Sequence, residues 1–152
     1  MPHTDKQPGS YALILQSDHH ASIQIGRHGD MTLQPGFYVY AGSAFGPGGL
    51  QSRLAHHRRI SIRPYWHIDY LRKQCELAEA WYTCDRQRRE HDWAHCLLEL
   101  PNARIPLAGF GSSDCQCPTH LLYFSSRPDV SVFRQRLLYN CPTHDEIFCQ
   151  TY

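Results

Sequence analysis

The chain has 152 residues, of which 41% are hydrophobic and 19% are charged, and its formal net charge is +1. This length predicts one domain with a single core, and the lack of a long apolar run or a basic leader excludes a membrane protein and predicts a soluble, cytoplasmic one. Seven cysteines, an odd number, favour reduced thiols over a disulfide framework.

The first third of the chain predicts short strands joined by turns. Residues 1–8 are polar and contain proline, so we expect a flexible N-terminal arm. A nearly continuous apolar run over 9–16 is typical of a central strand, and polar and apolar residues alternate over 22–26. A further strand is predicted over 37–44, where the small Gly42 lets a ligand or another chain approach the backbone. Together these strands predict an antiparallel hairpin or meander.

Helices and strands alternate over the rest of the chain. The predicted elements are a helix over 50–58, a helix over 65–73, a strand over 77–83, a helix over 86–100 with Asp85 as its N-cap, a strand over 121–125 and a helix over 130–138. Residues 141–152 are left as a C-terminal tail, which places the single domain at 9–140. The predicted fold class is α/β (α+β), with a small mixed, mostly antiparallel central sheet flanked by helices.

Basic residues are concentrated on and after the helix over 50–58. Arg53 and His57 lie one turn apart and would face the strand that carries Tyr40. The concentration predicts a surface that faces phosphate groups, although cations near a helix C-terminus also interact favourably with the helix dipole. The residues concerned are Arg53, His56, His57, Arg58, Arg59 and Arg63.

Glu90 lies on the predicted inward face of the helix over 86–100, three and four positions before Trp93 and Ala94. Burying a carboxylate without a partner is costly. Glu90 is therefore expected either to pair with an arginine, for which Arg53 is the obvious candidate, or to bind a metal ion.

The loop over 107–120 ends in the pattern Cys115-x-Cys117-x-x-His120, whose side chains are all possible zinc ligands. The spacing is too tight for an ordinary zinc finger, and no second local cysteine pair completes four ligands. The alternative interpretation is a loop packed under the sheet, in which the thiols act as small hydrophobic groups and Asp114 caps a turn.

Several motifs in this order resemble those of the GIY-YIG nuclease superfamily. They are Gly9-x-Tyr11, Tyr40-Ala41-Gly42, Leu50-x-x-Arg53-Leu54-x-x-His57 and the later Glu90. The longer stretches 66–71 and 109–121 more closely resemble the Uri-type endonuclease branch, a domain of unknown function that is sometimes fused to a DNA-glycosylase of the endonuclease III type. The likeness spans residues 9–133. It differs from the superfamily pattern in the middle residues of both triplets, which would point into the core, and in an added hairpin between the two tyrosines.

The resemblance implies a DNA endonuclease that hydrolyses phosphodiester bonds with one divalent ion, Mg²⁺ or Mn²⁺. It implies that Glu90 binds the metal, that Arg53 binds the phosphate and that Tyr40 fixes the water or the base. Either Tyr11 or His57 would accept the proton from water. A phenol with a pKa near 10 is a poor base at neutral pH, whereas an imidazole with a pKa near 6.5 is suited to it, and both remain candidates.

Other residues of the matching motifs have no role in the implied mechanism. They are expected to frame the cleft or to orient Arg53, and for His67 the alternative is a bond to a backbone carbonyl. These residues are His67, Asp69, Asp114 and His120, while Cys115 and Cys117 of the same motif are possible zinc ligands. Contacts to DNA are expected from Ser43, which stands where many relatives carry a lysine, and from Arg53, His56, Arg58, Arg59 and Arg63.

A compact domain with one short basic face has little surface for reading duplex sequence, so single-stranded, branched or damaged DNA is the expected substrate. One alternative is a nucleic-acid-binding module without cleavage, in which Glu90 and Arg53 form only an internal ion pair. Another is a zinc-stabilised interaction domain around Cys115, Cys117 and His120.

Overall fold

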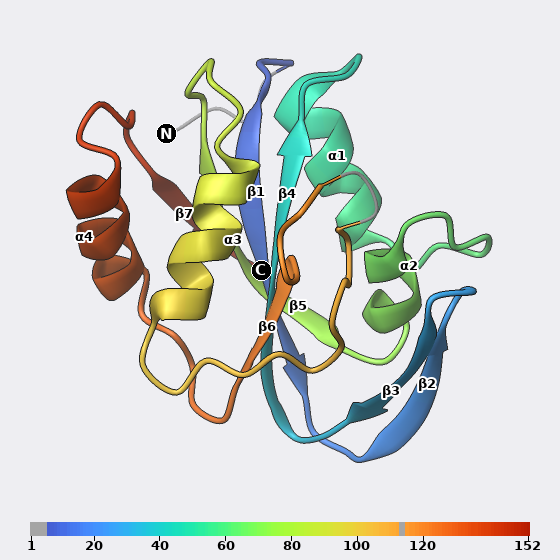
Figure 1. Ribbon diagram of the computed structural model, residues 1–152. Coiled ribbons are helices and arrows are strands. Elements are labelled where there is room, and N and C mark those ends of the chain that lie inside the picture. Colours follow the sequence, from blue (N-terminus) through green and yellow to red (C-terminus); the bar gives the residue numbers. More distant parts are fainter. Residues whose placement is uncertain (1–5, 113–114) are drawn as a thin grey trace.

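A computed structural model describes residues 6–112 and 115–152. Its elements are β1 (Gly9–Ser17), β2 (Ala21–Ile25), β3 (Gly29–Leu33), β4 (Gly36–Ala44), α1 (Gly49–Arg58), α2 (His67–Arg72), β5 (Glu76–Thr83), α3 (Glu90–Glu99), β6 (Leu121–Phe124), α4 (Val130–Asn140) and β7 (Phe148–Thr151). Five strands form one antiparallel sheet in the order β6-β4-β1-β5-β7, and the four helices flank it (Figure 1). The predicted fold class is confirmed.

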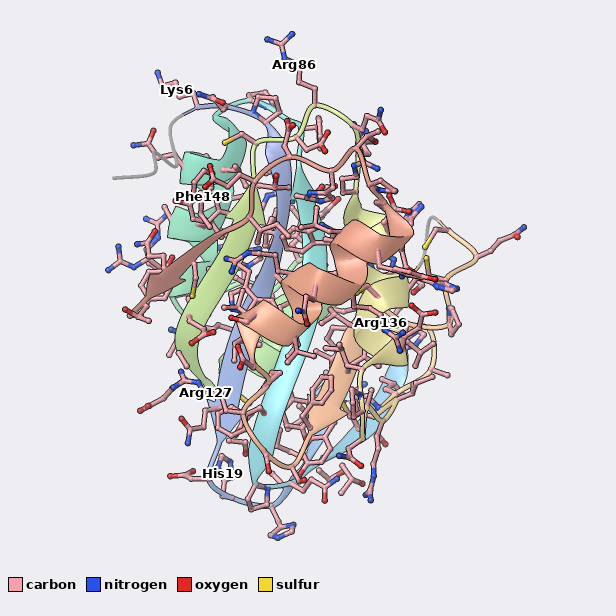
Figure 2. The ribbon with its side chains drawn as sticks, turned by 90° about the vertical axis from the view of Figure 1, so that its left-hand side faces the viewer. Lys6, His19, Arg86, Arg127, Arg136 and Phe148 are labelled. Carbon is pink, nitrogen blue, oxygen red and sulfur yellow. The ribbon has the colours of Figure 1, made fainter. Side chains whose placement is uncertain are left out.

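The central strand β1 divides its side chains between two cores. Tyr11 and Leu13 belong to the core beneath α1 and α2, whereas Ala12 and Ile14 belong to the core beneath α3 and α4. Figure 2 shows α4 lying across the second face, with Phe148 marking β7. Because both faces of the sheet are covered, β1 needs apolar side chains at successive positions, which explains its nearly continuous apolar run.

Strands β1 and β4 are direct neighbours, so the two tyrosine triplets lie side by side. Tyr11 pairs with Gly42, and Leu13 pairs with Tyr40. A Cβ atom on Gly42 would lie 2.5 Å from the hydroxyl oxygen of Tyr11, so the glycine gives room to this phenol. The intervening β2 and β3 form a separate two-stranded sheet. The first third is therefore a long β1–β4 pairing with an inserted hairpin, and not a simple meander.

Both ends of the described chain contact the domain. In the predicted arm, the carbonyl of Gln7 accepts a hydrogen bond from the backbone of Leu50 at the start of α1, at 2.9 Å. The predicted tail over 141–152 includes β7, which pairs with β5. The structure contains no disulfide between any of the seven cysteines. Within residues 6–112 and 115–152, no helix has the length and apolar character needed to span a membrane.

Candidate functional site

The start of α3 is fixed by a buried network. The helix begins at Glu90, later than the sequence predicts, and Asp85 is not its N-cap. Asp85 instead forms an ion pair with the guanidinium of Arg89 at 3.0 Å and accepts from the backbone of Gln87. The backbone N–H of Arg89 donates to the hydroxyl of Ser10 on β1 at 3.0 Å. Ser10 is the middle residue of the first triplet, and its bond ties the first turn of α3 to the sheet.

Glu90 therefore sits at the helix N-terminus, with its side chain 22% exposed. One carboxylate oxygen lies 2.8 Å from Nδ1 of His120. Burial alone would raise the pKa of Glu90, but hydrogen bonds from His120 and Ser43 outweigh it and hold the pKa below its ordinary value. The carboxylate is thus ionised at neutral pH. Among the described residues its ion pair is with His120, and the predicted pairing with Arg53 is not found.

Tyr11 and His57 form a buried hydrogen-bonded pair. The phenol oxygen lies 2.7 Å from Nε2 of the imidazole, and the side chains are 1% and 2% exposed. Burial raises the pKa of Tyr11 well above its ordinary value, although the nearby guanidinium of Arg53 opposes the rise. Burial, with His56 adding to it, lowers the pKa of His57 to about 3. Both groups are therefore neutral at neutral pH.

Arg53 is held by a strand carbonyl and an aromatic ring. Its Nη1 donates to the carbonyl of Ser43 at 2.8 Å, and its guanidinium carbon lies 4.5 Å from the ring centroid of Trp66. A cation over an indole face is a favourable arrangement. Tyr40 lies with its ring centroid 6.5 Å from that of His57, and burial, with Tyr11 adding to it, raises its pKa. Arg53 is thus oriented by Trp66, whose backbone donates to Asp69, and by the carbonyl of Ser43.

Two neighbouring cavities flank the end of β4. One, of about 300 Å³, is lined by Glu90, Ser43 and Gly111. The other, of about 240 Å³, is lined by Arg53 and Trp66. Ser43 links the two, since its carbonyl accepts from Arg53 and its hydroxyl bonds to Glu90. A fixed negative charge and a fixed positive charge thus lie on either side of one strand end.

Only part of the predicted basic cluster lies around these cavities: Arg53 and His56 line one of them, and Arg58, Arg59 and Arg63 line neither. Arg58 lies over the ring of Tyr152, 5.0 Å from its centroid, just beyond edge strand β7. Arg59 and Arg63 are exposed. Arg88, which the sequence analysis missed, lines the cavity that contains Glu90, and the basic run immediately before Glu90 was its only signal.

His67 and His56 have defined local partners. Nδ1 of His67 accepts a hydrogen bond from the backbone N–H of Gly111 at 2.8 Å. The alternative in the sequence analysis was a bond to a backbone carbonyl, whereas the partner of Nδ1 is a backbone donor. Nε2 of His56 lies 2.9 Å from the carboxylate of Asp69, whose other oxygen accepts from two backbone N–H groups before α2. Asp69 therefore caps α2 and holds His56.

Replacing Asp69 with alanine is expected to lower the free energy of unfolding by about 1 to 3 kcal/mol at neutral pH, because three partly buried donors lose their acceptor. Burial would raise the pKa of Asp69, but these bonds lower it overall. A depressed pKa gives stability that is present above about pH 4 and is lost as the pH falls through the folded-state value. Urea unfolding of the wild type and the variant, at neutral pH and well below about pH 4, tests this, because the difference between their free energies of unfolding should shrink at the lower pH. Asp18→Ala, at an exposed acid, should change little at either pH.

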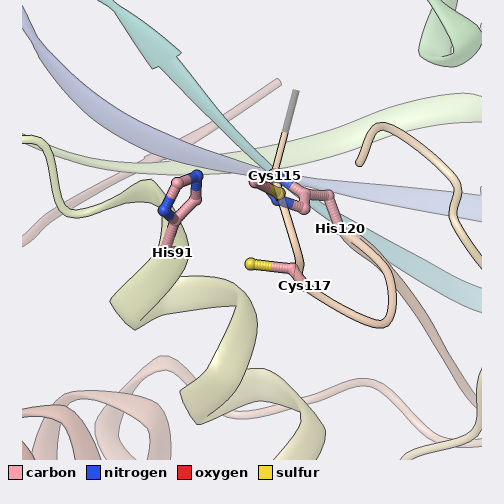
Figure 3. Close-up of side chains that lie close together, drawn as sticks. All are labelled: His91, Cys115, Cys117 and His120. Carbon is pink, nitrogen blue, oxygen red and sulfur yellow. The ribbon is translucent and has the colours of Figure 1, made fainter. Parts of the chain in front are cut away.

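Cysteine and histidine side chains gather beside Glu90. His91 of α3 and the residues Cys115, Cys117 and His120 each offer one ligand atom, and these atoms lie within 4.8 Å of one another (Figure 3). The cluster could hold a metal ion, as could His56, His57 and Asp69. His91 was missed because it lies far from the cysteines in the sequence. Asp114 lies outside the described residues.

One family model, described as "Domain of unknown function DUF123", matches residues 10–141. No curated protein and no solved structure matches the chain significantly. The matched span contains both tyrosines, Arg53, Glu90 and the cysteine–histidine cluster.

Proposed function

We propose that this chain, which belongs to the DUF123 family, is a metal-dependent DNA endonuclease of the GIY-YIG superfamily, in its Uri-type branch. The observation that carries the proposal is the meeting of four kinds of group at the end of the β1–β4 pair. An ionised acid, a fixed guanidinium, a phenol–imidazole pair and a second phenol all lie there. Hydrolysis of a phosphodiester needs these functions in one place.

Glu90 fits a hard divalent cation such as Mg²⁺ or Mn²⁺. Its ionised carboxylate lines a cavity of about 300 Å³, and Mg²⁺ is commonly held by one or two carboxylates together with water and substrate phosphates. When bound, the ion supplies positive charge next to the reacting phosphate. Ser43 and His120 would keep the carboxylate in place through their hydrogen bonds.

Arg53 is suited to bind a phosphate oxygen because Trp66 and the Ser43 carbonyl fix its guanidinium before substrate arrives. In the reaction the oxygen of a water molecule bonds to phosphorus, and the bond from phosphorus to one sugar oxygen breaks. The phenol oxygen of Tyr11 would take the proton of the water while its own proton passes to Nε2 of His57, so the two residues act as a unit, and the departing sugar oxygen would take a proton from solvent. Tyr40, which lies beside Gly111 at the cavity of Glu90, would orient the water.

The substrate class we propose is single-stranded, branched or damaged DNA. Stacked aromatic and arginine side chains such as Trp66 and Arg53 are typical of surfaces that bind unpaired strands. Arg88, His56, Arg58, Arg59 and Arg63 would add contacts to the phosphate backbone.

The test is incubation of the full chain with end-labelled single-stranded, forked and duplex DNA, with Mg²⁺, with Mn²⁺ and with a chelator. We expect cleavage of the unpaired or forked DNA in the presence of either ion and intact DNA in the chelator lanes. DNA that is bound but stays intact with both ions would contradict the proposal and support the binding module without cleavage.

A further inference from the structure

We propose that His91, Cys115, Cys117 and His120 hold one structural zinc ion. The site goes beyond the proposed hydrolysis, because its ligands are different in kind from the oxygen donors that Mg²⁺ or Mn²⁺ prefers. It also does not depend on hydrolysis being the correct function.

The four side chains lie close enough together to form a tetrahedral centre. Zinc bonds of about 2.3 Å to sulfur and about 2.0 to 2.1 Å to nitrogen place the ligand atoms of a tetrahedron about 3.3 to 3.8 Å apart. In the structure the four ligand atoms already lie within 4.8 Å of one another, and the Sγ of Cys115 is 3.2 Å from Nε2 of His120. Only a small contraction brings all four to bonding distance.

The hydrogen bonds of His120 leave the required nitrogen available. Its Nδ1 faces two acceptors, the carboxylate of Glu90 at 2.8 Å and the carbonyl of Ala41 at 3.2 Å, so this nitrogen carries the proton. The lone pair of a neutral ring then belongs to Nε2, which faces Cys115. A histidine that donates to a carboxylate through one nitrogen and binds metal through the other is the usual arrangement at zinc sites.

The chemistry of the ligands selects the ion. Two thiolates and two imidazoles are soft or borderline donors that favour zinc over Mg²⁺ or Ca²⁺, and four protein ligands leave no open position for substrate. Cys115 and Cys117 are only partly buried, which favours metal ligands over thiols packed as small hydrophobic groups.

A zinc ion here would join two separate segments. His91 lies in the first turn of α3, and the other three ligands lie in the loop that leads into β6. The same ion would fix the ring of His120, which bonds to Glu90. Zinc would therefore hold the loop against α3 and keep the carboxylate of Glu90 in its position.

The test is the metal content of the full chain, purified under reducing conditions and with any histidine tag removed. We expect about one zinc ion per chain by mass spectrometry, and visible absorption typical of tetrahedral, thiolate-bound cobalt after replacement with Co²⁺. Removing a group that only hydrogen-bonds to a metal ligand lowers metal affinity by about 10- to 100-fold. His91 is itself a proposed ligand, so His91→Ala should weaken zinc binding by at least about 100-fold in competition with a chelating dye.

His95→Ala is the matched control, since His95 is an exposed histidine one turn later on the same helix, outside the cluster. It should bind zinc like the wild type. His91 is exposed, so its replacement should leave the fold intact, and circular dichroism checks this. Fewer than about one zinc ion per ten chains, without the cobalt absorption, would overturn the proposal. Unchanged affinity in His91→Ala would overturn the ligand set. Neither measurement uses DNA, so failure of the zinc site and failure of the nuclease are separable.

Discussion

Replacing Glu90 with glutamine is expected to reduce the rate of DNA cleavage by about a thousandfold or more. The substitution keeps the size of the side chain but removes the charge that would hold the divalent ion. The remaining amide oxygen can still accept from Nδ1 of His120, so the local fold should persist. Single-turnover cleavage of forked DNA in Mg²⁺ and in Mn²⁺ measures the loss.

Glu99→Gln is the matched control, because Glu99 is an exposed acid at the other end of the same helix. We expect it to cleave at the wild-type rate. If Glu90→Gln cleaved as fast as Glu99→Gln with a full complement of divalent ion, the carboxylate would have no part in the chemistry and the proposed metal site would be wrong. A thermal unfolding curve for each variant separates loss of chemistry from loss of fold.

The Tyr11–His57 pair gives the second large effect. Tyr11→Phe and His57→Ala are each expected to lower kcat by about 10²- to 10⁴-fold, the usual contribution of general base catalysis. Because the two groups share one hydrogen bond of 2.7 Å, the double variant should be hardly slower than the slower single one. Losses that multiply in the double variant would show that the residues act independently. Tyr139→Phe, at an exposed phenol on α4, should have no effect.

The protonation state of His57 gives a separate check on this pair. Burial lowers its pKa to about 3, so its ring should stay neutral throughout the range from about pH 8 to pH 5, where ordinary histidines titrate. In a proton NMR titration, the imidazole signal that disappears in His57→Ala should therefore not shift across this range. A titration midpoint near the ordinary histidine pKa would mean that the Tyr11–His57 pair is open to solvent, and that His57 could act as a base without Tyr11.

The pattern of apolar residues was sufficient to predict most of the fold. The run over 9–16 predicts a strand covered on both faces, and β1 is that strand, with its odd and even residues in different cores. The start of α3 was harder to predict. Aspartate is a common N-cap residue, but Asp85 accepts from the backbone of Gln87 and pairs with Arg89, and the helix starts only at Glu90. Local capping preferences could not predict this start, because the backbone of Arg89 bonds to Ser10 on the distant strand β1.

The candidate site residues could also be named from the sequence. Tyr11, Tyr40, Arg53, His57 and Glu90 were named because their motifs resemble those of the GIY-YIG superfamily, and helical spacing also placed Arg53 beside His57. Which side chain pairs with which could not be predicted, because partners such as Glu90 and His120 are 30 positions apart and meet only when β6 is added beside β4. The sequence by itself therefore determined most of the elements, though not β3 and β7, and the chemical groups of the site. The tertiary structure alone decided that His120 and not Arg53 holds Glu90, and that His91 lies close to Cys115, Cys117 and His120, because such contacts depend on distances that no local pattern contains.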